Sequence, residues 1–374
     1  MEGLRKPIEL DGEWKMGIEL TIPMAIQYGD FLFTRGQIDV DEKTRVLNRG
    51  NAIAQVKTCV RHIARTLASA GAKADGIVQL THYYRAGSVE DPRVLKDIIL
   101  SKLKAPEDTP VALVPVPHFY FDGTEGEPDA IVMMPDRHPT YTRILAVDWV
   151  TLAKEGDLGF LGGTKFITSE NLERTRLELS QLVSAFKHST GRARIYIQAR
   201  DICTYNNIRD GLKLAADGWA INFLPCITPE VEDISISVVG SVMLNGSGQW
   251  TFDEQGAAWL LTGNGLGFID LIDATEIAVP KGLATTEVLA RQARRMMDSV
   301  GENLATQGIG FGHVLKATTY YRGGRNSDDL YANLSVRDSY YSYPGPASTG
   351  VPFLELDRPN AELVSSLIVA FPNA

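Results

Sequence analysis

The sequence predicts an α+β protein in which one small fold occurs three times in succession. The first observation is that three amphipathic, helix-like stretches end at similar intervals, before Gly71, Gly191 and Gly308. The second is that strand-like segments flank each of these stretches in the same order. Because an order that recurs at a fixed period indicates tandem structural units, we expect three similar domains.

The first helix of each unit is predicted from the spacing of its apolar residues. In 51–70 these residues lie three or four positions apart, at Ile53, Val56, Val60, Ile63 and Leu67. Such spacing places the apolar side chains on one face of a helix. Matching helices are predicted over 169–190 and 286–307, and each stops at a glycine. Glycine commonly ends helices because it adopts the left-handed conformation without strain.

Strand-like segments complete the order β-β-α-β-α-β in every unit. Hairpins are predicted before the first helices, over 29–40, 156–167 and 265–279. Short β-rich strands follow these helices and end at Arg85, Arg200 and Arg322. The second helices are predicted over 89–104, 205–220 and 327–341, and the closing apolar strands over 129–134, 234–244 and 363–371. We therefore expect domains over 1–137, 138–246 and 247–374, with joints at 135–142 and 245–249.

Composition excludes several classes of partner. The 374 residues carry a formal net charge of −9, whereas a nucleic-acid partner requires a cationic surface. No apolar stretch is long enough to span a membrane, and the first residues do not form a signal peptide. Three widely spaced cysteines favour the cytoplasm. The six histidines lack metal-binding spacing, so we expect neither a metal nor another cofactor.

The first unit resembles the Rid/YjgF family, which includes RutC-like enamine and imine deaminases. The resemblance lies in GDFLFTRGQI, in the strand that ends HYYR, and in the closing stretch over 109–132. The third unit resembles the family through YYR and PASTGV, and the more diverged second unit through GDLGFLGG and ISISVVG. The resemblance implies a chorismate-mutase-like fold and ligand clefts between neighbouring units. Three fused units would form a pseudo-trimer within one chain, which we expect to be a monomer or a dimer.

The resemblance also implies a catalytic glutamate. In deaminating members of the family, a glutamate on the last strand positions water, and Glu127 matches that position in the first unit. The corresponding places fall on Ser365 in the third unit and near Ser235 in the second. A carboxyl group that is buried has a raised pKa, which suits general acid–base catalysis. The alternative is a solvated carboxylate beside Glu125 and Asp129.

The family arginine that holds a substrate carboxylate is absent. Its place falls on Ala112 in the first unit and on Ser348 in the third. Arg35 is predicted to compensate for it, the alternative being a surface arginine at a strand end. Ser348 and Thr349 offer two hydroxyl groups next to Gly350 for substrate binding, although the same residues are common in turns.

Three further residues are candidates for substrate binding. Tyr84 and Tyr321 lie on the strands that follow the first helices, and Arg322 ends the second of these strands. The alternative for the tyrosines is a place in the core or between units. The alternative for the arginine is an ion pair between domains.

Three classes of function agree with these residues. The first is an enzyme acting on a small reactive metabolite, by default hydrolysing an enamine or imine, or catalysing a related cyclisation, tautomerisation or elimination. The second is a chorismatase-like hydrolase or lyase acting on a carboxylated ring, although there the resemblance places the glutamate in the last unit. The third is a protein that binds a metabolite without catalysis, favoured by the missing arginine.

Overall fold

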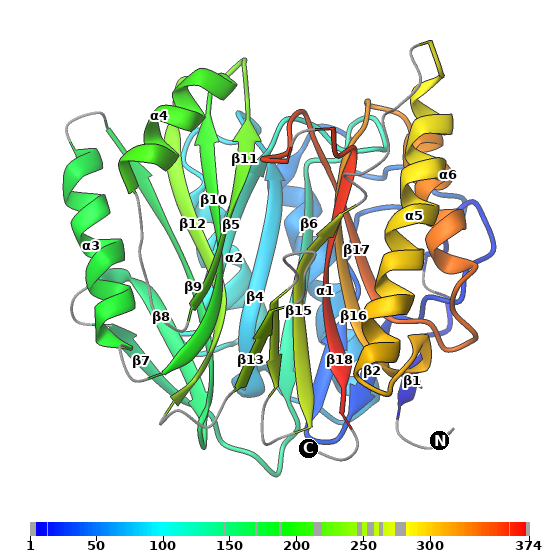
Figure 1. Cartoon of the computed structure of the whole chain (residues 1–374), viewed down its shortest axis with the longest axis horizontal. Helices are drawn as coiled ribbons and strands as arrows, with labels where there is room; N and C mark the ends of the chain where they lie inside the picture. Colours follow the sequence, from blue (N-terminus) through cyan, green and yellow to red (C-terminus); the bar gives the residue numbers. More distant parts are fainter. Residues whose placement is uncertain are drawn as a thin grey trace.

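The computed structural model describes residues 5–12, 14–144, 147–168, 171–186, 189–212, 219–244, 249–252, 258–261, 265–273, 282–358 and 360–371. Within these ranges the chain forms three six-stranded sheets and six α-helices (Figure 1). Each sheet is built from one continuous third of the chain. The predicted fold class, α+β with three successive similar units, is confirmed.

The three units share one order of elements. The first contains β1 (Lys6–Ile8), β2 (Ala25–Tyr28), β3 (Phe31–Thr34), α1 (Ala52–Ala70), β4 (Ile77–Arg85), α2 (Arg93–Leu103), β5 (Val111–Val116) and β6 (Gly126–Met133). The second contains β7 (Thr140–Ile144), β8 (Val147–Glu155), β9 (Leu158–Ile167), α3 (Leu172–Ala185), β10 (Thr190–Ala199), α4 (Ile202–Leu212), β11 (Trp219–Ile227) and β12 (Ile234–Met243). The third contains β13 (Gln249–Phe252), β14 (Ala258–Leu261), β15 (Leu266–Asp273), α5 (Thr285–Thr306), β16 (Val314–Arg322), α6 (Ser327–Asp338), β17 (Ala347–Phe353) and β18 (Leu363–Ala370).

Strand order is identical in the three sheets. Counted within its own unit, each sheet runs first, second, third, sixth, fourth, fifth. The fourth and fifth strands pair in parallel in every unit, as β4–β5, β10–β11 and β16–β17.

Each predicted hairpin, over 29–40, 156–167 and 265–279, contains only one strand among its described residues, namely β3, β9 and β15. The hairpin predictions are therefore wrong, because the second strand of each unit lies before the predicted range. The first strand of each unit and the strand after the second helix were not predicted either. The unpredicted strand β5 reads VALVPV. Its internal proline argues against a strand in the sequence, because proline cannot donate a backbone hydrogen bond to a neighbouring strand.

Two predicted helix ends are wrong in the second unit. Helix α1 does end at Gly71, which has the left-handed φ of 73°. Gly191, however, lies in β10, and α3 already ends at Ala185. A side chain at Gly191 would meet the Trp219 ring, so this glycine serves close packing instead of helix termination. Trp219 itself, placed by prediction in the second helix, begins β11.

Parts of two other predictions lie outside the described residues. These parts are 274–279 of the third hairpin and most of the joint over 245–249. The other joint, over 135–142, includes the first residues of β7.

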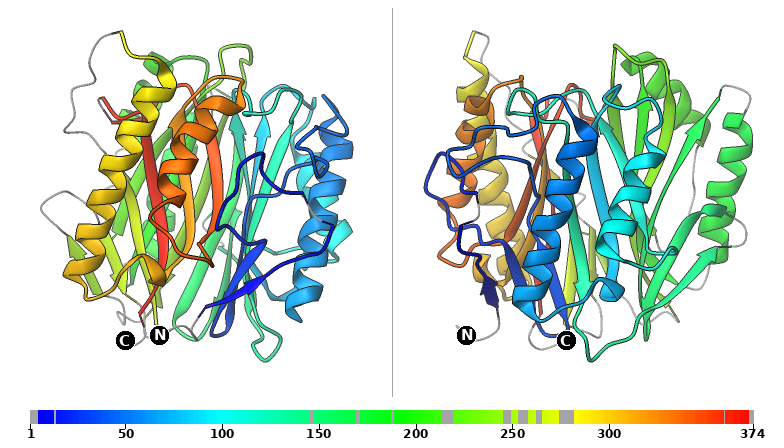
Figure 2. Two further views of the ribbon diagram at one scale, coloured as in Figure 1. Left: turned by 90° about the vertical axis from the view of Figure 1, so that its right-hand side faces the viewer. Right: turned by 180° about the vertical axis from the view of Figure 1, so that it is seen from behind.

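The sheets lie inside the molecule and the helices lie outside (Figures 1 and 2). Phe33, Phe160 and Phe268 come from the third strands of the three sheets, and all three are fully buried in one apolar cluster. The Phe160 ring contacts the Phe268 ring edge-on, with centroids 6.5 Å apart. Each unit thus covers an aromatic sheet face of its neighbours.

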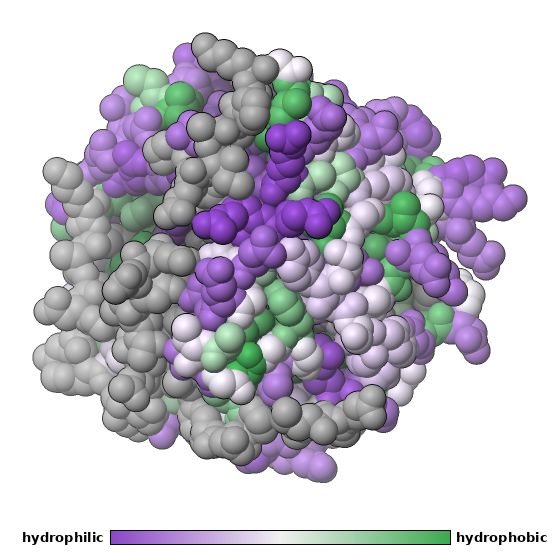
Figure 3. All heavy atoms as spheres, turned by 45° about the vertical axis from the view of Figure 1, so that its right-hand side comes forward, coloured by the Kyte–Doolittle hydropathy of each residue, from purple (hydrophilic) through white to green (hydrophobic). Residues whose placement is uncertain are grey.

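One face of the outer surface shows a mixed character in its described residues. The face in Figure 3 combines hydrophilic residues with small groups of hydrophobic residues. Within the described part of the chain, none of the helices has the length and apolarity needed to cross a membrane.

Candidate functional site

A small cavity lies between the first and third units, with a volume of about 30 Å³. From the first unit it is lined by Trp14, Met16, Leu20, Ile22, Arg35, Gly36, Tyr120 and Glu127. From the third unit it is lined by Leu330, Leu334, Arg337, Ser348 and Gly350. The structure therefore brings together three of the residues predicted from the sequence, Glu127, Arg35 and Ser348.

Glu127 is the acidic group of this cavity. Strand β6 holds it opposite Tyr83, and its side chain is 3% exposed. Tyr120 donates its hydroxyl hydrogen to Glu127 Oε2 at 3.1 Å. Burial, with a smaller contribution from the charge of Asp129, raises the pKa of Glu127 to about 8, against the lowering effects of Tyr120, Lys316 and Arg35. At neutral pH Glu127 is thus mainly a carboxylic acid that can donate a proton.

Gly36 makes room for that carboxyl group. A Cβ atom at this position would lie only 1.8 Å from Glu127 Oε1. The backbone N–H of Gly36 also donates to the carbonyl of Ser348 at 3.1 Å, which ties the first unit to the third. The requirement for glycine here is steric: any side chain would push the carboxyl group out of place.

On the prediction that Glu127 is catalytic, we expect Gly36→Ala to lower turnover by roughly 10²-fold, because displacing a catalytic group by about 1 Å has an effect of this order. The measurement is turnover under conditions where circular dichroism shows a native fold. Gly211→Ala is the matched control, since no atom lies within 4 Å of a Cβ built at this α4 residue. Equal turnover in the Gly36 variant and the control would contradict the importance of this contact.

Arg35 is buried next to the carboxyl group. Its side chain stacks on the Trp14 ring at 4.1 Å, and its NH2 group donates to the Trp14 carbonyl at 2.8 Å. Its positive charge also lowers the pKa of Glu127. The alternative of a solvated surface arginine is therefore wrong, because Arg35 is 8% exposed.

Arg337 is a second guanidinium group in the cavity, and sequence reasoning missed it. It lies on α6, is 4% exposed, and donates to Asn333 Oδ1 at 2.9 Å and to Thr319 Oγ1 at 2.9 Å. Both partners are neutral. Burial lowers the pKa of Arg337 to about 10, so it remains charged at neutral pH. A signal was present, because Leu330, Leu334 and Arg337 are spaced as one helix face.

Ser348 and Thr349 point in different directions. Ser348 lines the Glu127 cavity. Thr349 donates its hydroxyl hydrogen to Asp129 at 2.7 Å, away from that cavity. Neighbouring residues of a strand face opposite sides of the sheet, and both residues lie on β17. Only Ser348 is therefore placed to contact a ligand beside Glu127.

The remaining three predicted residues lie elsewhere or at the margin. Tyr84 packs in the apolar core between its own sheet and helices α1 and α2. Arg322 forms ion pairs with Glu362 at 3.4 Å and Glu355 at 3.5 Å within its own unit, and not between domains. Burial raises the pKa of Tyr321, and the charge of Glu127 contributes to this rise; the buried hydroxyl group of Tyr321 has no partner among the described residues.

The other two units have no carboxylate at the equivalent position. Strand register places Val364 opposite Tyr320, as Glu127 lies opposite Tyr83. The expected third-unit equivalent, Ser365, is therefore one residue off, and its hydroxyl group contacts Thr319 at 2.6 Å. Ser235 of the second unit donates to Gln198. Of the three positions compared, Glu127, Ser235 and Ser365, only Glu127 carries a carboxyl group that can transfer a proton.

Comparisons with known proteins find relatives of the first unit. The family described as Endoribonuclease L-PSP matches residues 22–113, which include Arg35 and Gly36. A RutC family protein of Pyrococcus abyssi is 34% identical over 61 residues, or 16% of this chain and 48% of the relative. This part of the chain is similar to the Rid/YjgF family. It spans about half the length of the curated Rid/YjgF relative that it matches.

Solved structures are also similar to this chain. A chorismatase crystal structure matches 79% of this chain and 93% of its own, with a TM-score of 0.52 and 13% sequence identity. This similarity shows the fold alone. RidA from the Antarctic bacterium Psychrobacter sp. PAMC 21119 is 22% identical over 34% of this chain and 99% of its own, with a TM-score of 0.30. Among the described residues, no three His, Cys, Asp or Glu side chains are grouped to hold a metal ion.

Proposed function

We propose that this protein is an enzyme that hydrolyses a small anionic enamine or imine in the Glu127 cavity. The observation that carries the proposal is a buried carboxyl group of raised pKa in one cavity with two guanidinium groups, those of Arg35 and Arg337. A protonated carboxyl group suits proton donation at neutral pH. The guanidinium groups suit binding of a substrate carboxylate.

The chemistry of the proposed reaction needs one proton donor and one water molecule. Glu127 gives its proton to the β-carbon of the enamine, whose nitrogen lone pair forms the C=N bond of an iminium ion. The resulting carboxylate takes a proton from the water molecule that attacks the iminium carbon. The carbinolamine then collapses to a carbonyl compound and ammonia, while Glu127 ends the cycle protonated. A tautomerisation or an elimination would use the same proton transfer.

Substrate entry requires the segment over 14–22 to move. The cavity of about 30 Å³ has room for one or two water molecules and not for an organic substrate. This segment contributes Trp14, Met16, Leu20 and Ile22 to the cavity wall and contains no helix or strand. Its polar attachments to α6 are the Thr21 bonds to Asp338, the shortest at 2.8 Å, and a Gly17 bond to Tyr331 at 3.2 Å. We propose that it opens to admit the substrate and closes to exclude water.

A second candidate function is that of a hydrolase or lyase acting on a carboxylated ring, the class to which chorismatase belongs. The two guanidinium groups favour it, since a ring carboxylate would satisfy them equally well. We also propose that the three sheets define domains over 1–137, 138–246 and 247–374, and that only the cleft between the first and third is catalytic.

The test is a substrate panel with the full-length protein. Freshly generated 2-imino acids, matched imines without a carboxylate, and carboxylated cyclic enol ethers are compared by release of ammonia or of the carbonyl product. The proposal expects the 2-imino acids to be turned over well above the rate in buffer, and the uncharged imines far more slowly. Turnover of the enol ethers alone would support the second candidate. No acceleration of any member would refute both.

A further inference from the structure

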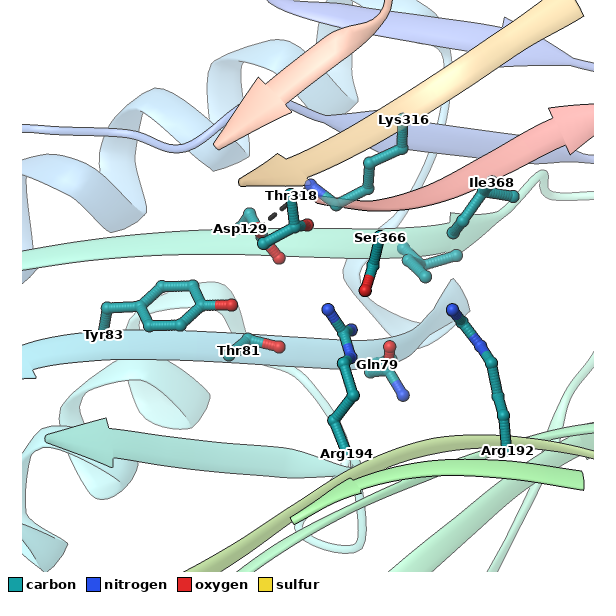
Figure 4. Close-up of a pocket in the computed structure, with 11 residues that line it drawn as sticks. Gln79, Thr81, Tyr83, Asp129, Arg192, Arg194, Lys316, Thr318, Ser366 and Ile368 are labelled. Atoms are coloured by element: carbon teal, nitrogen blue, oxygen red, sulfur yellow. Dashed lines mark ion pairs between the residues drawn. The ribbon is translucent and has the colours of Figure 1, made fainter. Parts of the chain in front are cut away.

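A second enclosed space lies at the centre of the molecule, where the three sheets meet (Figure 4). Its volume is about 10 Å³, and none of the Glu127 cavity residues lines it. Its charged side chains are Asp129 from the first unit, Arg192 and Arg194 from the second, and Lys316 from the third. All four are at least nine-tenths buried. The proposed reaction uses none of them directly.

Two of the three cations have carboxylate partners. Lys316 Nζ lies 3.0 Å from Asp129 Oδ2, as the dashed line in Figure 4 marks. Arg192 NH1 lies 3.3 Å from Asp270 Oδ1. Arg194 bonds instead to a neutral group, donating from NH1 to the Tyr320 hydroxyl group at 2.7 Å. Among the described residues at this centre, three cations thus face two carboxylates.

The tyrosines at the centre do not supply the missing negative charge. The hydroxyl group of Tyr320 contacts those of Tyr196 at 2.5 Å and Tyr83 at 3.3 Å, so each unit contributes one ring. Burial raises the pKa of all three tyrosines, outweighing the opposite effect of Arg194. The hydroxyl groups are therefore neutral at physiological pH, and the charge of Arg194 stays uncompensated by protein groups. Burying an unpaired charge strongly destabilises a fold.

The central cavity also contains a buried hydrogen-bond donor that a ligand could use. Arg192 Nε is buried and has no hydrogen-bond partner among the described residues. Figure 4 shows Arg192 and Arg194 rising from β10 with their guanidinium ends toward Ser366. Two residues apart on one strand, they face the same side. A ligand between them would be anionic and would accept hydrogen bonds.

We propose that this central cavity binds one small monovalent anion of the halide class, held by Arg192 and Arg194. Size limits the class, because a space of about 10 Å³ is close to that of a single water molecule, and among common anions the monatomic halides come nearest to this size. Phosphate, sulfate and carboxylates are too large. The anion balances the charge of Arg194 at the place where all three units meet, and it therefore stabilises their association. In cells the abundant halide is chloride.

The test is thermal unfolding of the full chain in chloride and in methanesulfonate at equal ionic strength and pH. Methanesulfonate is too large for the cavity, so nonspecific screening is held constant. A ligand of the folded state raises the unfolding midpoint as its concentration rises. We expect about 3–6 °C between about 1 and 100 mM chloride, with saturation. Equal midpoints in the two salts would overturn the proposal.

Two variants separate this site from other halide effects. Arg194→Gln removes the uncompensated charge and should abolish the chloride dependence. Arg200→Gln, which changes an exposed arginine just after the same strand, should keep it. Chloride dependence that persists in Arg194→Gln would overturn the proposal.

A direct measurement covers the case in which Arg194→Gln does not fold. Crystals of the unchanged protein grown in sodium bromide should show one anomalous peak between Arg192 and Arg194. A map without that peak would overturn the proposal. So would a tyrosinate absorption band near neutral pH in halide-free buffer, because Tyr320 would then carry the balancing charge.

Discussion

Glu127→Gln is expected to lower turnover by about 10²–10⁴-fold while the protein keeps its fold, because this is the usual contribution of a general acid–base group. Glutamine keeps the shape of the side chain and can still accept the Tyr120 hydrogen bond. It cannot donate an acidic proton. The measurement is kcat on the best substrate of the imine panel, and unchanged kcat would reduce the cavity to a binding site.

The pH dependence of kcat distinguishes a proton-donating role of Glu127 from a purely structural role. Burial raises the pKa of Glu127 to about 8, so the proton-donating form is lost as pH rises through that value. The kcat of the unchanged protein should therefore fall about tenfold per pH unit above roughly pH 8. In Glu127→Gln this limb should disappear. Glu125→Gln, in which the altered side chain faces Arg85, should retain it.

At pH 8, Glu127→Gln should increase the stability of the fold although it lowers turnover. In the unfolded chain the Glu127 carboxyl group ionises above its ordinary pKa of 4.5, whereas the folded protein keeps it protonated up to about pH 8. The free energy of unfolding of the unchanged protein should therefore fall by up to ~1.4 kcal/mol per pH unit across this window. Glu127→Gln escapes this loss, so it should be the more stable protein at pH 8 but not at pH 4.

Arg337→Gln should have the second largest effect, an increase of roughly 10–10²-fold in KM for substrates that carry a carboxylate. Losing one charge-assisted hydrogen bond costs ~1.5–3 kcal/mol, which corresponds to this range. The KM of an uncharged imine should stay the same, and this distinguishes binding from a structural role. Arg322→Gln is the matched control, because that arginine pairs with Glu362 within its own unit. Equal KM increases for charged and uncharged substrates would contradict the assignment.

The sequence predicted the repeated fold because the repeat lies in local patterns. Apolar spacing located α1, and Gly71 ended it as expected. The same argument failed at Gly191, which is required for packing against Trp219. A glycine with this role cannot be distinguished in the sequence from a glycine that ends a helix. Strand β5 was missed because prolines within a short run are typical of loops.

The sequence predicted only some of the residues of the candidate site. Family resemblance pointed to Glu127 and Ser348, and also to Arg35, which replaces a small residue where the family's first hairpin borders the ligand. Whether side chains from different units meet depends on how the sheets pack, which no local pattern encodes. Arg337 was missed for this reason, and Tyr84 was included although it packs against its own helices.

The shared aromatic cluster around Phe33, Phe160 and Phe268 has a consequence for synthesis of the chain. The first sheet is complete at Met133, but the last strand of the third ends at Ala370. A ribosome adding roughly 5–20 residues per second needs on the order of 10–50 s to cover that distance. Until both later units are complete, the nascent first sheet presents Phe31 and Phe33 without the full set of partners that bury them. Because the three units are in one polypeptide, they do not have to associate as separate subunits. The first unit must instead remain partly uncovered until the later units are translated, and chaperones can bind its apolar surface during that time.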